Sequence, residues 1–150
     1  MRRRSVAYAL AALVLVSATA IVVWLSVLRQ EPLAPQAQVV QDLLQLRKER
    51  SQDASAYAQY LQSDELAVQL AESARIESQD ATGPPVPDWE TPYVSEEAPA
   101  SADVVVVWVE PGSYPDWPRA TVFVTVLVDG TWVISDAEAI EGTQTVPPKP

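Results

Sequence analysis

The chain has 150 residues, contains no cysteine and no histidine, and carries a formal net charge of −10 at pH 7. Without cysteine it has no disulfide, thiol nucleophile or cysteine–metal site. Without histidine it lacks the commonest general base near neutral pH and the commonest metal ligand. The sequence also has no phosphate-binding glycine loop, serine-hydrolase elbow or zinc-protease motif. We therefore expect no catalytic, cofactor-binding or metal site, and a protein that is not an enzyme.

The N-terminal residues predict a membrane segment. Residues 1–4 carry Arg2, Arg3 and Arg4, and the next 24 residues, 5–28, have no charge. At about 1.5 Å per residue this helix is long enough to cross a ~30 Å hydrocarbon core. Because the positive charges precede the span, we expect residues 1–4 to stay in the cytoplasm as the tail of an uncleaved signal anchor. The alternative is a cleaved signal peptide ending at "ATA", residues 18–20, although the apolar run continues past it.

The part that follows the span is strongly acidic. Four of the ten basic residues lie within the first 30 positions, whereas all 20 acidic residues follow, so the remainder carries a net charge of −14. This charge repels phosphate backbones, and no basic stripe offsets it, so we expect no nucleic-acid binding. The sequence places the protein in the cell membrane as a single-pass protein with its C-terminal domain outside the cytoplasm.

Residues 29–36 form a proline-containing spacer, and a folded domain is predicted over residues 37–141, beginning with three helices. Apolar residues recur with helical spacing from Val39 to Leu46. Asp53 is a suitable N-cap for a short helix over residues 54–61, and Ser63 for a third helix. In the third helix, Leu66 and Leu70 belong to the apolar face that we expect to be buried.

The rest of the domain predicts strands. Residues 80–102 contain five prolines and are expected to form an exposed connector. The segment "DVVVVWVE", residues 103–110, is apolar enough for a strand buried on both faces. Two further β-branched runs meet at Asp129-Gly130, which suits a two-residue hairpin turn with positive φ angles. Residues 142–150 are expected to be a disordered tail. Helices followed by strands predict an α+β fold in which the helices pack on a curved antiparallel sheet of about three to four strands.

Two segments carry a resemblance to a known fold. "DASAYAQYL", residues 53–61, is similar to the short second helix of the nuclear-transport-factor-2-like cone fold, and "DGTWVISDAEAI", residues 129–140, is similar to its final hairpin strand. With a preceding anchor, the layout resembles bacterial single-pass proteins such as Mce-associated membrane proteins and inner-membrane components of conjugation machinery. This resemblance implies a non-catalytic scaffold that meets other envelope proteins. The proline-rich residues 83–99 depart from it, because they stand where such folds have a first strand and a further helix.

Asp136 and Glu138 are the candidate polar residues of a pocket. They lie two apart, so in a regular strand they would share one face with Trp132 and Ile134. If that face lines a pocket, Asp136 could act as a base, with a donor from one of two tyrosines, Tyr57 or Tyr60. The alternative is that Asp136 and Glu138 mark the solvated end of the strand.

The loop "SYPDWP" offers a second candidate surface. Its Tyr114 and Trp117 are residue types that anchor protein interfaces. The alternative is that Trp117 folds back and covers the edge of the sheet.

These observations predict a membrane-anchored, extracytoplasmic interaction or scaffold module without catalytic activity, which contacts the membrane through residues 5–28 and binds other envelope proteins. The alternatives are a small-ligand-binding module and an enzyme of the isomerase or lyase type with a cone-shaped pocket. Whether Asp136 points into an enclosed apolar cavity distinguishes them.

Overall fold

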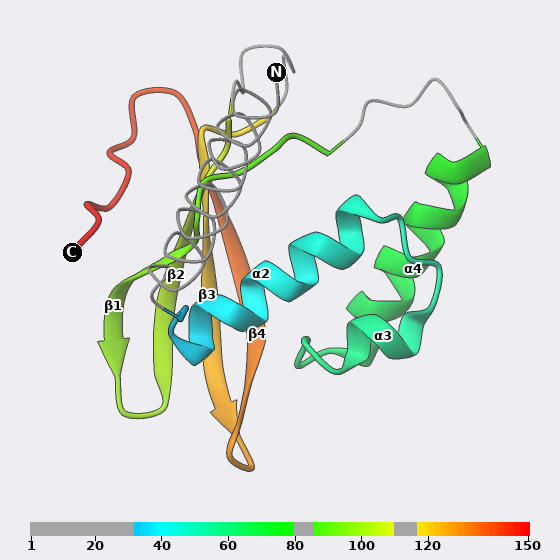
Figure 1. Cartoon of the computed structure of the whole chain (residues 1–150), viewed down its shortest axis with the longest axis horizontal. Coiled ribbons are helices and arrows are strands. Elements are labelled where there is room, and N and C mark those ends of the chain that lie inside the picture. The colour runs from blue at the N-terminus through cyan, green and yellow to red at the C-terminus, as the bar shows by residue number, and fades with distance from the viewer. Residues whose placement is uncertain (1–31, 80–85, 110–116) are drawn as a thin grey trace, which may run out of the picture. The chain divides into compact units, whose positions relative to one another are not determined.

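The structure, a computed structural model, describes residues 32–79, 86–109 and 117–150. Within these ranges the chain forms three helices and then four strands (Figure 1). No helix in them is long and apolar enough to cross a membrane, and the predicted span over residues 5–28 lies outside them. The elements are α2 (Pro35–Lys48), α3 (Ala54–Ala58), α4 (Asp64–Gln79), β1 (Tyr93–Ala98), β2 (Ser101–Val107), β3 (Ala120–Val128) and β4 (Thr131–Ile140).

The starts of α3 and α4 follow the predicted capping chemistry, whereas α2 begins at Pro35, inside the segment predicted as a spacer. Pro35 opens α2, where its missing N–H costs no helical hydrogen bond. The Asp53 carboxylate accepts a hydrogen bond from the Ser55 N–H at 2.9 Å, before α3. The Ser63 hydroxyl accepts from the Leu66 N–H at 3.2 Å, at the start of α4. These local bonds divide the helical part of the sequence into three elements.

The four strands form one antiparallel sheet in the order β1-β2-β3-β4. The predicted turn between β3 and β4 is confirmed, since Val128 pairs with Thr131 and the two residues between them have positive φ angles, 49° at Asp129 and 80° at Gly130. The first strand, β1, lies inside the segment predicted as a connector. It forms an edge strand whose backbone pairs with β2, while its sequence "YVSEEA" is too polar and too poor in β-branched residues to predict a strand.

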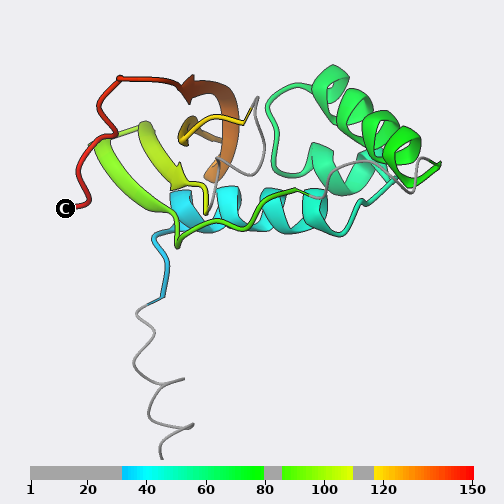
Figure 2. The same ribbon diagram turned by 90° about the horizontal axis from the view of Figure 1, so that it is seen from above.

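The helices cover one face of the sheet, so the predicted α+β arrangement of helices on an antiparallel sheet is confirmed. Helix α2 contacts β1, β2 and β4, and α4 packs mainly against α3 (Figure 2). The strand β2 is buried on both faces: Val104 and Val106 belong to the core shared with the helices, and Val105 to a small cluster on the opposite face.

The C-terminal residues cover part of that opposite face. Val146 packs against the cluster of Val105 and Ile140, and the Tyr93 hydroxyl donates to the Pro147 carbonyl at 2.6 Å. The segment expected to be a disordered tail thus lies against the sheet without forming a helix or strand. Its sequence has too few apolar residues to predict this contact, which depends on the apolar cluster of that face and on the Tyr93 side chain.

Candidate functional site: an apolar cleft

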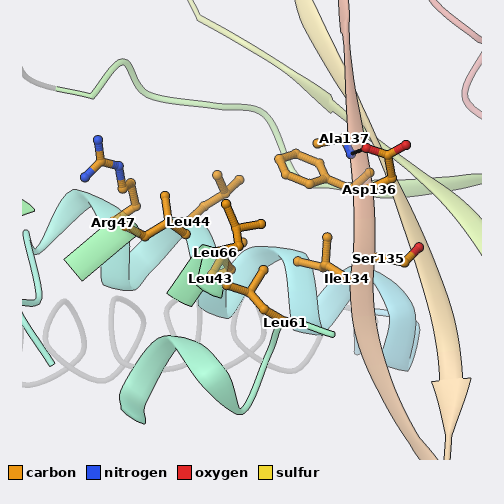
Figure 3. Close-up of a pocket in the computed structure, with 11 residues that line it drawn as sticks. Leu43, Leu44, Arg47, Leu61, Leu66, Ile134, Ser135, Asp136 and Ala137 are labelled. Atoms are coloured by element: carbon orange, nitrogen blue, oxygen red, sulfur yellow. Dashed lines mark hydrogen bonds between the residues drawn. The ribbon is translucent and has the colours of Figure 1, made fainter. Parts of the chain in front are cut away.

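An apolar cleft of about 390 Å³ lies between the helices and the β3–β4 hairpin (Figure 3). Leu43 and Leu44 from α2 line it, together with Leu66 from α4. The sheet contributes Phe123 and Ile134. The remaining lining residues are Arg47, Leu61, Leu70, Ser135, Asp136 and Ala137. Its volume falls in the range of about 300–1,000 Å³ that is typical of small-molecule sites.

The leucines of the cleft come from helix positions that their spacing places on one side. Leu66 and Leu70 are four residues apart on α4, so they stack on the same face. The buried face of the same helix is formed by Ala67 and Ala71, while Leu66 remains 40% exposed. The prediction that Leu66 is buried is therefore wrong. Short alanine side chains let the helix approach its neighbours at its centre, and the longer Leu66 beside them forms a wall that no element of the described residues covers.

The guanidinium of Arg47 lies at one end of this row of leucines. Arg47 and Asp136 lie at opposite ends of it in Figure 3. The Arg47 Nη2 pairs with the Glu77 Oε1 at 2.6 Å, and the Arg50 Nη1 donates to the Glu77 carbonyl at 3.3 Å. These contacts join the C-terminal ends of α2 and α4. They hold the two helical walls of the cleft at a fixed separation.

The sheet side of the cleft is shaped by a β-bulge at Ser135. Ile134 pairs with Thr125, whereas Asp136 pairs with the adjacent Val124, so Ser135 is an extra residue in the ladder. Its hydroxyl donates to the Val124 carbonyl at 3.1 Å. Residues that pair directly share one face of the sheet. Ile134 therefore faces the helices, and Asp136 faces away from them with Val124. The prediction that Asp136 and Glu138 share a face with Trp132 and Ile134 is wrong, because the bulge interrupts the two-residue period.

Asp136 touches the cleft only from its mouth. Its side chain is exposed, and its Oδ1 accepts a hydrogen bond from the Ala137 N–H at 2.8 Å. In Figure 3 the carboxylate points away from the leucine side chains. The cleft itself is open and does not enclose this carboxylate.

The other residues predicted for a pocket do not line the cleft. Tyr57 is fully buried in the core, where its hydroxyl donates to the Leu46 carbonyl at 3.4 Å. Burial raises the pKa of the Tyr57 phenol above its usual value, and the nearby Arg47 opposes the shift. Tyr60 packs on the edge of the core, and Trp132 is half-buried opposite Leu127. Of the four predicted residues, the structure brings only Asp136 to the cleft.

The predicted aromatic surface has a different environment. Tyr114 lies outside the described residues. Trp117 is half-buried and packs edge-to-face on Trp108, with ring centroids 5.4 Å apart. Trp89 makes a similar contact on Trp108 at 6.3 Å. Trp117 thus adopts the alternative in which it folds back onto the sheet, as part of a cluster of three tryptophans.

Sequence reasoning missed most residues of the cleft. Helical spacing placed the leucines on apolar faces, but no local signal distinguishes a buried face from the wall of a cleft. Among the residues that the structure describes, no group of three or more acidic side chains is placed to hold a metal ion. Comparisons of the chain with protein-family models, with curated proteins and with solved structures found no match.

Proposed function

We propose that this protein is a membrane-anchored interaction module without catalytic activity, and that its α+β domain binds another envelope protein through the apolar cleft. Residues 5–28 would hold the domain at the extracytoplasmic surface. The acidic charge suits a domain that binds protein rather than nucleic acid.

The observation that carries this proposal is the exposed apolar wall of the cleft. Leu66 is 40% exposed, although it lies beside Leu70, Phe123 and Ile134. Removing apolar surface from water contributes about 25 cal/mol per Å². A partner side chain that fills the cleft would gain this contribution on both surfaces. Apolar residues at the centre of a contact, surrounded by charged ones, are also the usual anatomy of a protein interface.

The position of Asp136 argues against the enzyme alternative. A general base must come within hydrogen-bond reach of the proton that it removes. The bulge directs the Asp136 carboxylate away from the leucines, and one of its oxygens is already bonded to the Ala137 N–H. Tyr57 is buried in the core and cannot serve as the donor without unpacking. An isomerase or lyase in this cleft would lack the predicted base and the predicted donor, because neither Tyr57 nor Tyr60 lines the cleft.

Site-specific photo-crosslinking in the full chain tests the proposal. A benzophenone amino acid replaces Leu66 in one variant and Val68 in the other, in cells that make the protein. Val68 is the matched control, because it lies on the same helix, is 58% exposed and does not line the cleft. We expect a discrete cross-linked protein from position 66 and none from position 68. Equal products from both positions, or none from position 66, would contradict the proposal.

The volume of the cleft supports a second candidate function, which is binding of a small apolar molecule at the same place. Native mass spectrometry of the purified full chain would then show a bound molecule of fixed mass. That species would disappear in the Leu66→Ser variant and persist in the Val68→Ser variant. A cross-linked protein at position 66 together with an empty cleft in native mass spectra would leave only the interaction function.

A further inference from the structure

The outer edge of β4 is covered at one end by the chain itself. The Ile134 N–H donates to the Tyr60 carbonyl at 2.8 Å, and the Gln62 N–H donates to the Ile134 carbonyl at 2.9 Å. Leu61 forms a parallel bridge with Ile134 between these two bonds. Residues 60–62 therefore act as a short additional strand beside β4, ending where the bulge begins.

The edge is covered again beyond the end of the strand. The Glu141 N–H donates to the Gln144 side-chain oxygen at 2.8 Å, and the Gln144 N–H donates to the Glu141 carbonyl at 3.1 Å. The Ala137 N–H is occupied by the Asp136 carboxylate. In an antiparallel ladder, alternate residues of an edge strand direct both backbone groups outward. Ile134 does so before the bulge, and Ala137 and Ala139 do so after it.

Three outward groups remain in this gap. Within the described part of the chain, no hydrogen bond is formed by the Ala137 carbonyl or by the N–H and carbonyl of Ala139. A row of such groups on an edge strand is a template for an added strand. The gap lies at the mouth of the apolar cleft, because Ala137 is one of the residues that line it.

The two faces of the strand at this gap differ in chemistry. Ala137 pairs with Phe123 and Ala139 with Thr121, so both short side chains are on the face of the helices. Asp136 and Glu138 lie on the other face and are exposed. A strand added here would alternate in the same way. One of its side chains would enter the cleft, and its neighbours would lie beside the two carboxylates.

We propose that the partner docks as an extended segment that pairs with β4 at residues 137–139, with a large apolar side chain in the cleft and a basic side chain beside Asp136 and Glu138. This inference rests on the proposed function and specifies the chemistry of its partner. Backbone pairing fixes the register of the segment on β4. The apolar side chain contacts Phe123 and Leu66, and the opposite charge of Asp136 and Glu138 favours a lysine or arginine on the outer face.

A peptide with alternating lysine and leucine, six residues long and labelled with a fluorophore, is the probe for this site. The full chain is held in lipid nanodiscs made of neutral phosphatidylcholine, so that the peptide is not attracted to the lipid. We expect saturable binding, and at least tenfold weaker binding of the same peptide with glutamate in place of lysine. The Asp136→Lys/Glu138→Lys double variant should reverse this preference, since both side chains are exposed and their exchange leaves the core intact.

Two controls test the geometry rather than the charge alone. The Glu65→Lys/Glu72→Lys variant makes the same charge change on the exposed side of α4 and should keep the preference for lysine. Hydrogen exchange measured by NMR should show that the Ala139 N–H becomes protected when the peptide binds. An unprotected Ala139 N–H, or a preference for lysine that is the same in the Asp136→Lys/Glu138→Lys variant, would overturn this inference.

Its failure is distinguishable from failure of the proposed function. A discrete cross-link from position 66 without protection at Ala139 would keep the cleft as the interaction surface and reject docking along the strand. Absence of both would reject the two together. Protection at Ala139 with the expected reversal of charge preference would support both.

Discussion

Ile134 and Asp136 lie two residues apart in β4 but on opposite faces of the sheet, because Ser135 between them forms a β-bulge. The bulge gives the two halves of β4 different faces. It keeps Ile134 in the core, and it turns the carboxylates of Asp136 and Glu138 to the face away from the helices. It also lies where the covering segment, residues 60–62, ends. The bulge therefore sets both the mouth of the cleft and the start of the free edge.

We predict that deletion of Ser135 leaves the domain folded, with the free energy of unfolding changed by no more than about 1 kcal/mol. The deletion removes an exposed residue that is extra in the ladder, together with the hydrogen bond from its hydroxyl to the Val124 carbonyl. Ile134 and Asp136 would keep their partners Thr125 and Val124 in regular alternation. Urea unfolding followed by tryptophan fluorescence measures the change. Deletion of Glu138 is the control, since it shifts the buried Ile140 to the wrong face and should destabilise the domain much more. Equal losses in the two variants would contradict this role of the bulge.

Trp108 is the centre of the tryptophan cluster, so its replacement should be strongly destabilising. It is 6% exposed, contacts Trp89 and Trp117, and donates a hydrogen bond from its Nε1 to the Thr121 hydroxyl at 3.0 Å. We expect Trp108→Ala to lower the free energy of unfolding by about 3–5 kcal/mol. Chemical denaturation provides the measurement. The control is Leu127→Ala, at a site that is 38% exposed, and it should lower the free energy of unfolding far less. A comparable loss in the two variants would argue against the tryptophan cluster as a stabilising core.

The β3–β4 turn should depend on the glycine at its second position. Gly130 has a φ angle of 80°, and no neighbouring atom lies within 4 Å of the place where a Cβ would be. A substitution there meets backbone strain and no steric clash, so we expect Gly130→Ala to cost about 1 kcal/mol in the free energy of unfolding. Thermal or urea unfolding can resolve this difference. Asp129→Asn should be nearly neutral, because asparagine also tolerates a positive φ. A neutral Gly130→Ala variant would contradict the turn geometry.

The domain should lose stability in alkaline solution. Burial raises the pKa of Tyr57, and burial followed by the charge of Glu90 raises that of Tyr93, above the ordinary value of 10.0. A raised pKa means that the folded state favours the neutral phenol. This contribution is fully present below the unfolded-state pKa of about 10 and is lost as the pH rises through the folded-state pKa.

Urea midpoints measured from about pH 8 to pH 12 should therefore fall above about pH 10. The Tyr57→Phe variant should show a shallower fall, and the Tyr57→Phe/Tyr93→Phe variant a shallower one still. If neither variant changes the slope relative to the parent chain, ionisation of these tyrosines does not control alkaline unfolding.

The absence of cysteine allows a direct test of membrane topology. The variants Arg3→Cys and Val68→Cys each introduce one thiol, the first before the predicted span and the second at a site in α4 that is 58% exposed. In right-side-out membrane vesicles, a membrane-impermeant maleimide should label Val68→Cys and leave Arg3→Cys unlabelled until detergent is added. The reverse pattern would mean that the domain faces the cytoplasm. Loss of Val68→Cys from the membrane fraction would indicate a cleaved signal peptide.

Several elements of this fold were predictable because their signals are local. An acidic or hydroxyl side chain before a helix predicts a cap, and Asp53 and Ser63 both form one. Asp129-Gly130 predicts a two-residue turn because few residue pairs tolerate two positive φ angles in succession. Each of these depends on a few neighbouring residues, so the sequence contains all the information that is needed.

The first strand and the cleft could not be predicted in this way. β1 has a polar sequence and owes its conformation to backbone pairing with β2. The position of Asp136 depends on one unpaired residue in β4, and a bulge has no reliable signature in a single sequence. Leu66 has the same spacing as a core residue but lies beside a space that no described element fills.

The sequence by itself therefore determined the order of helices followed by strands, the caps of α3 and α4, the hairpin turn and the absence of cysteine and histidine chemistry, because these follow from composition and from neighbours along the chain. Only the tertiary structure decided which apolar face is left open and which side of β4 carries Asp136. The physical reason is that exposure and strand register depend on contacts between distant segments. Such contacts exist only once α2, α4 and the sheet have packed together.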